Sequence, residues 1–286
     1  MANILVGTCS WSNPGLRGTF YPKEIPGRDM LGFYARHFRL VEVDSTYYHL
    51  PSYQSVKLWA ARTPDDFVFD VKAYKVLTKH DRTTEPDADT FHSFAAALEP
   101  MLTAGKLGVV LFQFPPWFKF SDENLEYIRE CKEQTQPYKL AIEFRSGSWL
   151  REDTVHQTLQ FLRENELAYV SVDEPQFPGS TVPPIAVATS NVAVVRFHGR
   201  NRNTWFKRDI SVEERFNYLY TEQELAEWVP KIRELAESAQ QVHVLMNNCY
   251  HDYSVRNARD ISRLLGDPGR ADGETSPQAD SQPRLL

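Results

Sequence analysis

Residues 192–200 read VAVVRFHGR, and this stretch carries the pattern that decides the fold. Its apolar residues form a short run of the kind found in strands that are buried on both faces, and the run ends in polar residues. Seven more runs of this kind occur along the chain. In chain order, the eight runs span residues 4–8, 40–44, 67–72, 108–113, 140–145, 168–173, 192–198 and 241–247.

Segments with the spacing of amphipathic helices lie between most of these runs. Asp89 and Ser121 each precede such a segment, and Thr221 with Glu224 forms the capping box that begins another. Strands and helices that alternate in this way favour a parallel sheet, and eight such units fit the size of a closed barrel. We therefore predict an α/β fold, a single (β/α)8 TIM-type barrel with parallel strands. The alternative is an open doubly wound sheet.

The barrel domain is predicted to span residues 1–265. The remaining residues, 266–286, contain almost no apolar side chains before the final two leucines. A segment of this composition cannot bury enough apolar surface to offset the entropy lost on ordering. The tail is therefore predicted to be disordered.

The composition is that of an ordinary globular protein, with 42% apolar and 24% charged residues. It excludes a disordered, collagen-like or coiled-coil chain, and no apolar run reaches the ~18–20 residues of a membrane span. No secretory signal is visible, and three cysteines make no disulfide framework, so we expect a cytoplasmic protein. The net charge of −6 argues against a protein that coats nucleic acid, although it leaves room for a local basic cleft.

Polar residues occupy alternate positions in five of the runs. Residues two apart share a face of a strand, and the outer face of a barrel must be apolar because it packs on helices. The polar face is therefore predicted to point into the barrel near its C-terminal mouth, where barrel enzymes place their chemistry. The alternative is a structural ion network that closes the top of the barrel. The residues on this face are Glu42, Asp44, Asp70, Lys72, Glu143, Arg145, Ser171, Asp173, Arg196 and His198.

The end of the seventh run brings three cationic or titratable residues together. Arg196, His198 and Arg200 would share a face, and Gly199 permits close approach of a ligand to the backbone. Barrels frequently bind phosphate after their last two strands, and the guanidinium fork suits phosphate. An anion cradle is therefore predicted here. The alternative is an internal scaffold in which Arg196 pairs with Glu143 or Asp173.

Other predicted strand ends add neutral and aromatic groups. Gln113 ends the fourth run, and Asn247 and Asn248 end the eighth. Aromatic residues beside cations can stack a base or a sugar ring, or can simply plug the barrel. Two long connections, 175–190 and 199–220, are predicted to be functional loops, the second of them a lid. The aromatic residues after strand ends are Trp11, Tyr47, Tyr48, Tyr74, Phe114, Trp117, Trp149 and Trp205.

A metal site is not predicted. Glu143, Asp173, His198 and Asn247 could ligate a divalent ion, but the arginines on the same face would repel it. Cys9 ends the first predicted strand and Cys249 follows the eighth, and these strands are neighbours in a closed barrel. The two thiols could form a redox pair or be buried and inert. No nucleophile elbow, Walker loop or dinucleotide fingerprint occurs, so no cofactor is evident.

Taken together, the motifs resemble the YecE-like family, a domain of unknown function, number seventy-two. The resemblance covers roughly residues 4–265 and implies a TIM-type barrel, but it implies no reaction, because that family has no settled activity. The motifs are GTCSW (7–11), FYP (20–22), VEVDSTYY (41–48), LFQFPP (111–116), EFR (143–145) with SW (148–149), RFHGR (196–200), NN (247–248) and NA (257–258).

The residues favour an enzyme that binds a phosphate-bearing ligand, a nucleotide or a nucleic-acid end, with phosphoester hydrolysis as one reaction. Arg145, Arg196 and Arg200 are predicted to hold the anion, and Glu143 or Asp173 to act as general base. His198 is predicted to move a proton or to donate a hydrogen bond to an oxyanion. One alternative is a carbohydrate or polyol isomerase or hydrolase. Another is a non-catalytic barrel whose basic loop binds nucleic acid or a partner. The oligomeric state is not indicated. Further predicted ligand-binding residues are Glu42, Asp44, Lys72, Gln113, Asn247, Asn248, Trp11 and Tyr47.

Overall fold

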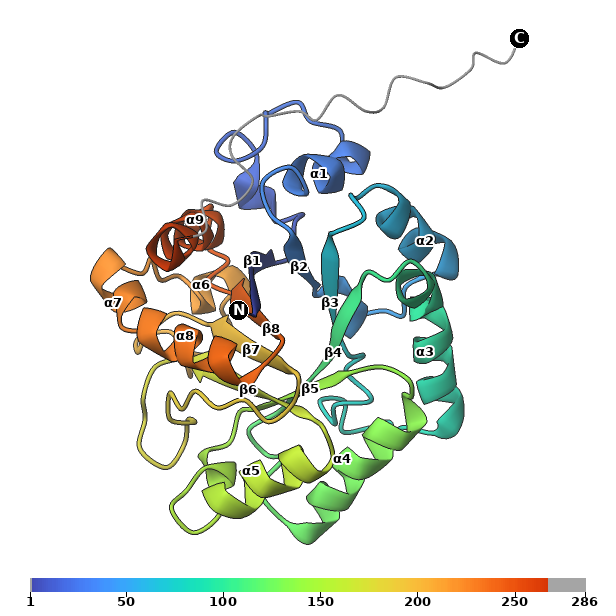
Figure 1. Cartoon of the computed structure of the whole chain (residues 1–286), viewed down its shortest axis with the longest axis vertical. Coiled ribbons are helices and arrows are strands. Elements are labelled where there is room, and N and C mark those ends of the chain that lie inside the picture. The colour runs from blue at the N-terminus through green and yellow to red at the C-terminus, as the bar shows by residue number, and fades with distance from the viewer. Residues whose placement is uncertain (1, 267–286) are drawn as a thin grey trace.

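A computed structural model describes residues 2–266 and shows eight parallel strands closed into a barrel (Figure 1). Each apolar run of the sequence forms one of these strands, so the predicted barrel is confirmed. The predicted disordered tail, Gly266 apart, lies outside the described residues. The strands are β1 (Asn3–Cys9), β2 (Leu40–Val43), β3 (Val68–Lys72), β4 (Leu107–Phe114), β5 (Leu140–Phe144), β6 (Ala168–Asp173), β7 (Val192–Phe197) and β8 (Gln241–Met246).

The strands follow one another around the barrel in sequence order, and β8 pairs with β1 to close it. This last pairing runs in parallel register from Asn3 opposite Gln241 to Thr8 opposite Met246. The closure excludes the open doubly wound sheet, because an open sheet would leave β1 or β8 at an edge.

Helices surround the barrel (Figure 1). Ser121 caps α4 and Thr221 with Glu224 caps α7, as predicted, whereas α3 is capped by Asp87 instead of Asp89. Asp89 lies in the first turn of α3, where its charge still favours the helix dipole. The helices are α1 (Gly27–Tyr34), α2 (Tyr53–Ala61), α3 (Ala88–Thr103), α4 (Asp122–Gln134), α5 (Val155–Glu164), α6 (Val212–Arg215), α7 (Glu222–Ala226), α8 (Val229–Ser238) and α9 (Tyr253–Leu265).

One unit of the barrel lacks its helix. Residues 174–191, between β6 and β7, contain neither helix nor strand, which confirms the long loop predicted there. Thr189 ties this loop to the barrel, since its hydroxyl accepts from the Tyr169 amide at 2.7 Å and donates to the Leu167 carbonyl at 2.6 Å. The second predicted loop, 199–220, is irregular except for the single turn of α6.

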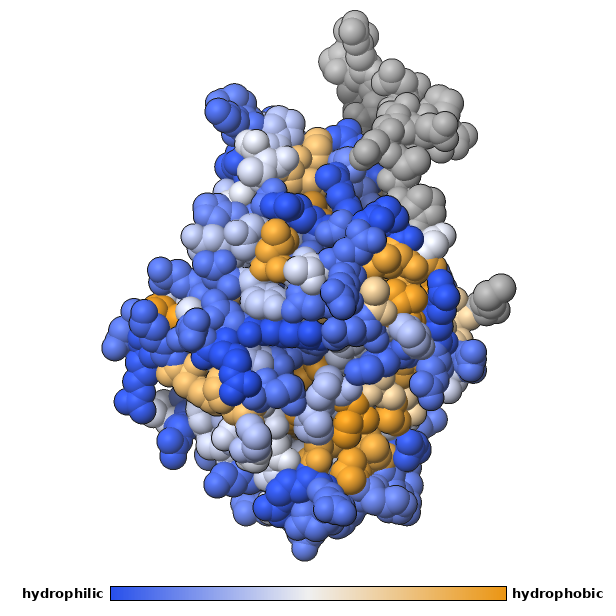
Figure 2. All heavy atoms as spheres, turned by 90° about the vertical axis from the view of Figure 1, so that its left-hand side faces the viewer, coloured by the Kyte–Doolittle hydropathy of each residue, from blue (hydrophilic) through white to orange (hydrophobic). Residues whose placement is uncertain are grey.

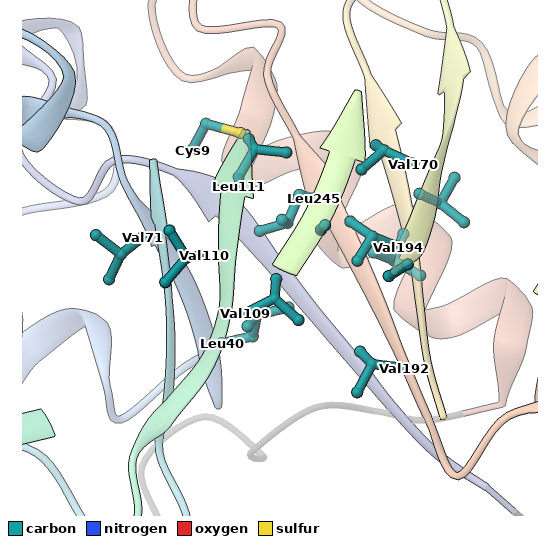
Figure 3. Packing of buried hydrophobic residues seen from close by; sticks show 14 of the residues in the cluster. Cys9, Leu40, Val71, Val109, Val110, Leu111, Val170, Val192, Val194 and Leu245 are labelled. Carbon is teal, nitrogen blue, oxygen red and sulfur yellow. The ribbon is translucent and has the colours of Figure 1, made fainter. Parts of the chain in front are cut away.

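Below its mouth the barrel interior is apolar except for one buried pair, in which His243 Nδ1 on β8 lies 2.9 Å from Asp70 Oδ2 on β3. Leu40, Val109, Val194 and Leu245 are all buried and come from four different strands (Figure 3). On the outside, the helices turn one face to the barrel and the other to water. The side that carries α7 and α8 is accordingly mostly hydrophilic, with separate apolar patches (Figure 2). Among residues 2–266, no helix has the length and apolarity needed to cross a bilayer.

Candidate functional site

Arg196 lies at the centre of a buried ion network at the top of the barrel. It projects inward from β7 and is 0% exposed. Its Nη1 donates to Glu143 Oε2 on β5 and its Nη2 donates to Glu42 Oε1 on β2, each at 2.5 Å. Gln113 on β4 accepts a longer bond of 3.3 Å from Nη1. Both ends of the guanidinium fork are thus occupied, so Arg196 holds the strands together and does not reach solvent.

His198 is held neutral beside this network. Its Nδ1 accepts from the Asn247 amide at 2.8 Å, so the proton lies on Nε2, which donates to Glu143 Oε1 at 3.1 Å. Burial lowers the pKa of His198 to about 3, against the opposing effect of the Glu143 carboxylate. The imidazole therefore carries no charge at neutral pH.

The predicted inward placement of Asp173 is wrong. In the strand register, Val172 lies opposite the inward Arg196, so Asp173 faces outward beside Phe197. There its Oδ1 accepts from the Tyr220 hydroxyl at 2.6 Å and its Oδ2 accepts from the Trp228 indole at 2.7 Å. Arg200 also binds this carboxylate, at 2.7 Å, and thereby turns away from the mouth. The contacts of Asp173 and Arg200 therefore attach the segment that contains Tyr220 and Trp228 to the outside of the barrel.

The next residue, Glu174, takes the inward place that Asp173 was expected to fill. Its Oε2 accepts from Arg145 Nη1 at 2.8 Å, and its Oε1 accepts from the Val182 amide at 3.1 Å. Burial raises the pKa of Glu174 to about 7, with the charge of Glu143 adding to the effect and that of Arg145 opposing it. Glu174 can therefore gain and lose a proton near neutral pH.

A cavity of about 620 Å³ opens beside Glu174 at the C-terminal mouth. Five of its lining residues are cationic and one is acidic, although the whole chain carries a net charge of −6. Of the predicted site residues, only Gln113 and Arg145 line it. The cationic residues are Lys119, Arg145, Lys207, Arg208 and Arg215, and the others include Ser146, Glu174, Ser180, Thr181 and Trp205.

The loop 199–220 forms one wall of this cavity. Trp205 stacks on Arg145, with the guanidinium carbon 4.8 Å from the ring centroid. Arg215 fixes the backbone of the loop, since it donates to the carbonyls of Trp205 and Lys207. Within residues 2–266, the side chains of Lys207 and Arg208 have no ion-pair partner. Their charge is therefore available to a ligand.

Several predicted ligand-binding residues lie elsewhere. Asn248 is fully buried and donates to the Tyr218 carbonyl and to Asn257. Trp11 packs edge-on against Trp59, with ring centroids 5.5 Å apart. These residues fasten loops. Asp44, Lys72 and Tyr47 do lie together near the mouth, because Lys72 Nζ is 4.0 Å from Asp44 Oδ1 and 4.9 Å from the Tyr47 ring centroid.

One group has the composition of a metal site. The ligand atoms of Cys9, Glu42 and Asp44 lie within 4.8 Å of one another. Arg196 Nη2, however, is 2.5 Å from Glu42 and 3.5 Å from the Cys9 sulfur. A divalent ion there would lie against a fixed guanidinium, so these residues do not fit a metal. The ligand set considered from the sequence is also divided, because Asp173 faces outward.

Comparisons with known proteins give a consistent result. A family model described as "Protein of unknown function DUF72" matches residues 5–282. The UPF0759 protein YunF of Bacillus subtilis (strain 168) is 36% identical over 269 residues, which make up 92% of this chain and 94% of YunF. The UPF0759 protein YecE of Escherichia coli (strain K12) is 31% identical over 116 residues, 40% of this chain and 39% of YecE.

Solved structures agree over nearly the whole chain. A DUF72 family protein from Thermotoga maritima has a TM-score of 0.82 and 36% identity, covering 92% of this chain and 99% of the other. A DUF72 family protein from Enterococcus faecalis has a TM-score of 0.83 and 31% identity, covering 92% and 95%.

Proposed function

The chain belongs to the DUF72 family, as its resemblance to YecE-like proteins predicted, and we propose that its mouth cavity binds and hydrolyses a phosphorylated ligand. The observation that carries the proposal is the charge of the cavity, with five cationic side chains around a single carboxyl group. A concentration of arginine and lysine in an acidic protein favours an anionic ligand, and guanidinium groups match phosphate geometry.

Arg145, Lys207 and Arg208 would hold the phosphoryl oxygens. Arg145 is positioned for this by Trp205 and Glu174 on either side. Lys207 and Arg208 approach from the loop wall of the cavity. As negative charge develops on the phosphoryl group in the transition state, these fixed cations stabilise it. Arg196, which the sequence predicted to hold the anion, is buried and would not contact the ligand. It would instead hold β2, β5 and β7 together through its ion pairs with Glu42 and Glu143.

Glu174 would act as the general base. As a carboxylate it accepts a proton from a water molecule, whose oxygen attacks phosphorus, and the ester oxygen leaves with the bonding electron pair. A base works best when its pKa lies near the working pH, and the pKa of Glu174 is about 7. The proton then returns from Glu174 to solvent before the next turnover.

A thermal-melt series tests ligand binding directly. Purified protein is melted with inorganic phosphate, ribose 5-phosphate, ribose, and a neutral polyol. A ligand at ~100 times its dissociation constant adds about 2.7 kcal/mol to the free energy of unfolding, which is readily measured. We expect the two phosphorylated probes to raise the melting temperature and the neutral probes to leave it unchanged.

A pair of double variants assigns the effect to the cavity. Lys207→Ala with Arg208→Ala removes two cavity cations, and the shift caused by ribose 5-phosphate should disappear. Lys23→Ala with Lys57→Ala removes the same charge from exposed positions outside the cavity and should preserve the shift. Equal shifts in both variants, or a shift with ribose alone, would refute the proposal and favour a carbohydrate ligand.

A further inference from the structure

A row of four aromatic rings lies beside the cavity and has no part in the proposed hydrolysis. We propose that this aromatic row, made of Tyr48, Tyr47, His80 and Trp117, is a base-stacking subsite, so that the phosphorylated ligand is a nucleotide. The inference rests on the proposed function, because the phosphate would lie in the cavity while the base lies on the row.

The rings form a continuous series. The centroids of Tyr48 and Tyr47 are 5.0 Å apart, those of Tyr47 and His80 are 5.2 Å apart, and those of His80 and Trp117 are 6.0 Å apart. Each contact is edge-to-face, the geometry that aromatic pairs prefer. The rings come from three different connections, those after β2, β3 and β4, and their contacts hold one another in place.

The two ends of the row are open to solvent. Tyr48 is 52% exposed and Trp117 is 49% exposed. The Trp117 ring is nevertheless fixed, because its indole nitrogen donates to the Lys79 carbonyl at 3.1 Å. An exposed ring with a fixed orientation is ready to stack without losing conformational freedom on binding.

The row adjoins the cavity in both sequence and space. Trp117 follows Pro116, which lines the cavity. The charges of Lys72 and Arg145 both lower the pKa of His80, after the larger effect of burial, so this ring lies near both cations. A ligand with its phosphate near Arg145 can therefore extend its other end over the row.

The chemistry of the row favours a flat base over a sugar. Cations lie over two rings, with Lys72 4.9 Å from the Tyr47 centroid and Arg82 5.8 Å from the Trp117 centroid. Two of the polar atoms of the row that could bind sugar hydroxyls are already used: His80 Nδ1 contacts the Thr78 hydroxyl at 2.8 Å, and the Trp117 indole nitrogen donates to the Lys79 carbonyl. Aromatic faces with adjacent cations are typical of base-stacking platforms.

Titration calorimetry with matched probes tests the subsite. The probes are adenosine 5′-monophosphate, ribose 5-phosphate, adenosine and a short oligodeoxythymidylate. We expect the mononucleotide to bind about 5- to 150-fold more tightly than ribose 5-phosphate, since stacking of one base on an aromatic ring contributes about 1–3 kcal/mol. Tighter binding of the oligonucleotide than of the mononucleotide would identify a nucleic-acid strand as the source of the nucleotide, and equal binding would identify a free nucleotide.

Three variants isolate the row. Trp117→Ala should remove the preference for the mononucleotide and leave the affinity for ribose 5-phosphate unchanged, whereas Trp117→Phe should retain most of it. Tyr53→Ala removes an aromatic ring that is equally exposed but lies outside the row, and should have no effect. Unchanged melting temperatures verify that each variant is folded.

The outcomes separate the two proposals. Equal binding of the mononucleotide and ribose 5-phosphate, or a preference that survives Trp117→Ala, overturns the subsite and leaves the phosphate cavity intact. Binding of adenosine without any binding of ribose 5-phosphate overturns the phosphate cavity and supports the row as a base site. If none of the probes binds, both proposals are refuted.

Discussion

Glu42 and Glu143 bind opposite ends of one guanidinium group, that of Arg196, at the same distance of 2.5 Å, yet their pKa values move in opposite directions. Burial raises the pKa of both carboxyls. For Glu143, the charges of Arg196 and Arg145 and the hydrogen bond from His198 outweigh burial and hold the pKa well below its ordinary value. For Glu42, burial and the neighbouring Asp44 outweigh Arg196 and raise the pKa to about 8. Arg196 therefore binds one carboxyl that stays ionised, that of Glu143, and one that titrates, that of Glu42.

Removal of Arg196 should damage the fold. Arg196→Ala leaves two buried carboxyls without their shared cation, and breaking a buried ion pair costs about 3–5 kcal/mol. The cost would appear as a lower urea midpoint. As a control, Arg263→Ala removes an exposed arginine that binds Glu222, and should leave the midpoint nearly unchanged. A fully stable Arg196→Ala protein would show that the network is dispensable.

The stability of the protein should depend on the protonation of Glu42. The pKa of Glu42 is about 8 in the folded protein and near 4.5 ordinarily, so between these values the folded state holds a proton that the unfolded state has lost. The contribution of Glu42 to the free energy of unfolding therefore falls as pH rises through this interval. Glu42→Gln keeps an acceptor for Arg196 but cannot titrate.

Urea unfolding between pH 5 and pH 8.5 would measure this effect. From the lower to the upper pH, wild type should lose at least about 1 kcal/mol more than Glu42→Gln, since one pKa unit corresponds to about 1.4 kcal/mol. The exposed Glu164→Gln on α5 should follow wild type. Parallel pH profiles for wild type and Glu42→Gln would mean that Glu42 titrates normally.

Hydrolysis should depend on Glu174. With p-nitrophenyl phosphate as the probe, Glu174→Gln should lower kcat by about 10²–10⁴-fold, the usual contribution of a general base. Wild-type activity should rise as the pH increases through about 7, where Glu174 loses its proton, and the pH profile of the variant should lack this rise. Asp173→Asn is the informative comparison. If this variant loses the rise of activity with pH and Glu174→Gln keeps it, Asp173 and not Glu174 is the base.

The turn after β7 should not tolerate a side chain at position 199. Gly199 has a φ of +87°, and a Cβ there would lie 2.7 Å from Cβ of Tyr218. Gly199→Ala should therefore cost about 1–3 kcal/mol, the usual cost of a strained backbone conformation. Gly27→Ala, at the start of α1, meets nothing within 4 Å and should be neutral or slightly stabilising. A thermal melt of both variants decides the matter.

The strands could be predicted from the sequence because each apolar run is short and ends in polar residues. The facing of β6 could not. Its sequence, AYVSVD, has small or apolar residues at both parities, so alternation does not reveal that Asp173 faces outward. The register of β6 against Arg196 reveals it. A usable signal was present, however, since Asp173 and Glu174 are adjacent and must lie on opposite faces.

The cavity was less accessible to sequence reasoning than the network. The network residues lie on strands, where a period of two places each side chain. Lys119, Lys207 and Arg208 instead lie in connections whose path depends on tertiary contacts, such as those of Arg215 with the backbone of residues 205 and 207. Periodicity contains no information about such paths, which is why charge in the loop 199–220 indicated an anion site without locating it.

The pairing of β1 with β8 has a consequence for synthesis. On the ribosome, β1 emerges first, and its partner at one edge, residues 241–246, emerges only after every other strand. Until then the nascent sheet exposes unpaired backbone groups at two edges, which are templates for aggregation. The closing contacts are also among the longest-range in the chain, and such contacts slow folding. We therefore expect productive folding to be largely post-translational, with a nascent chain that depends on chaperones until β8 is released.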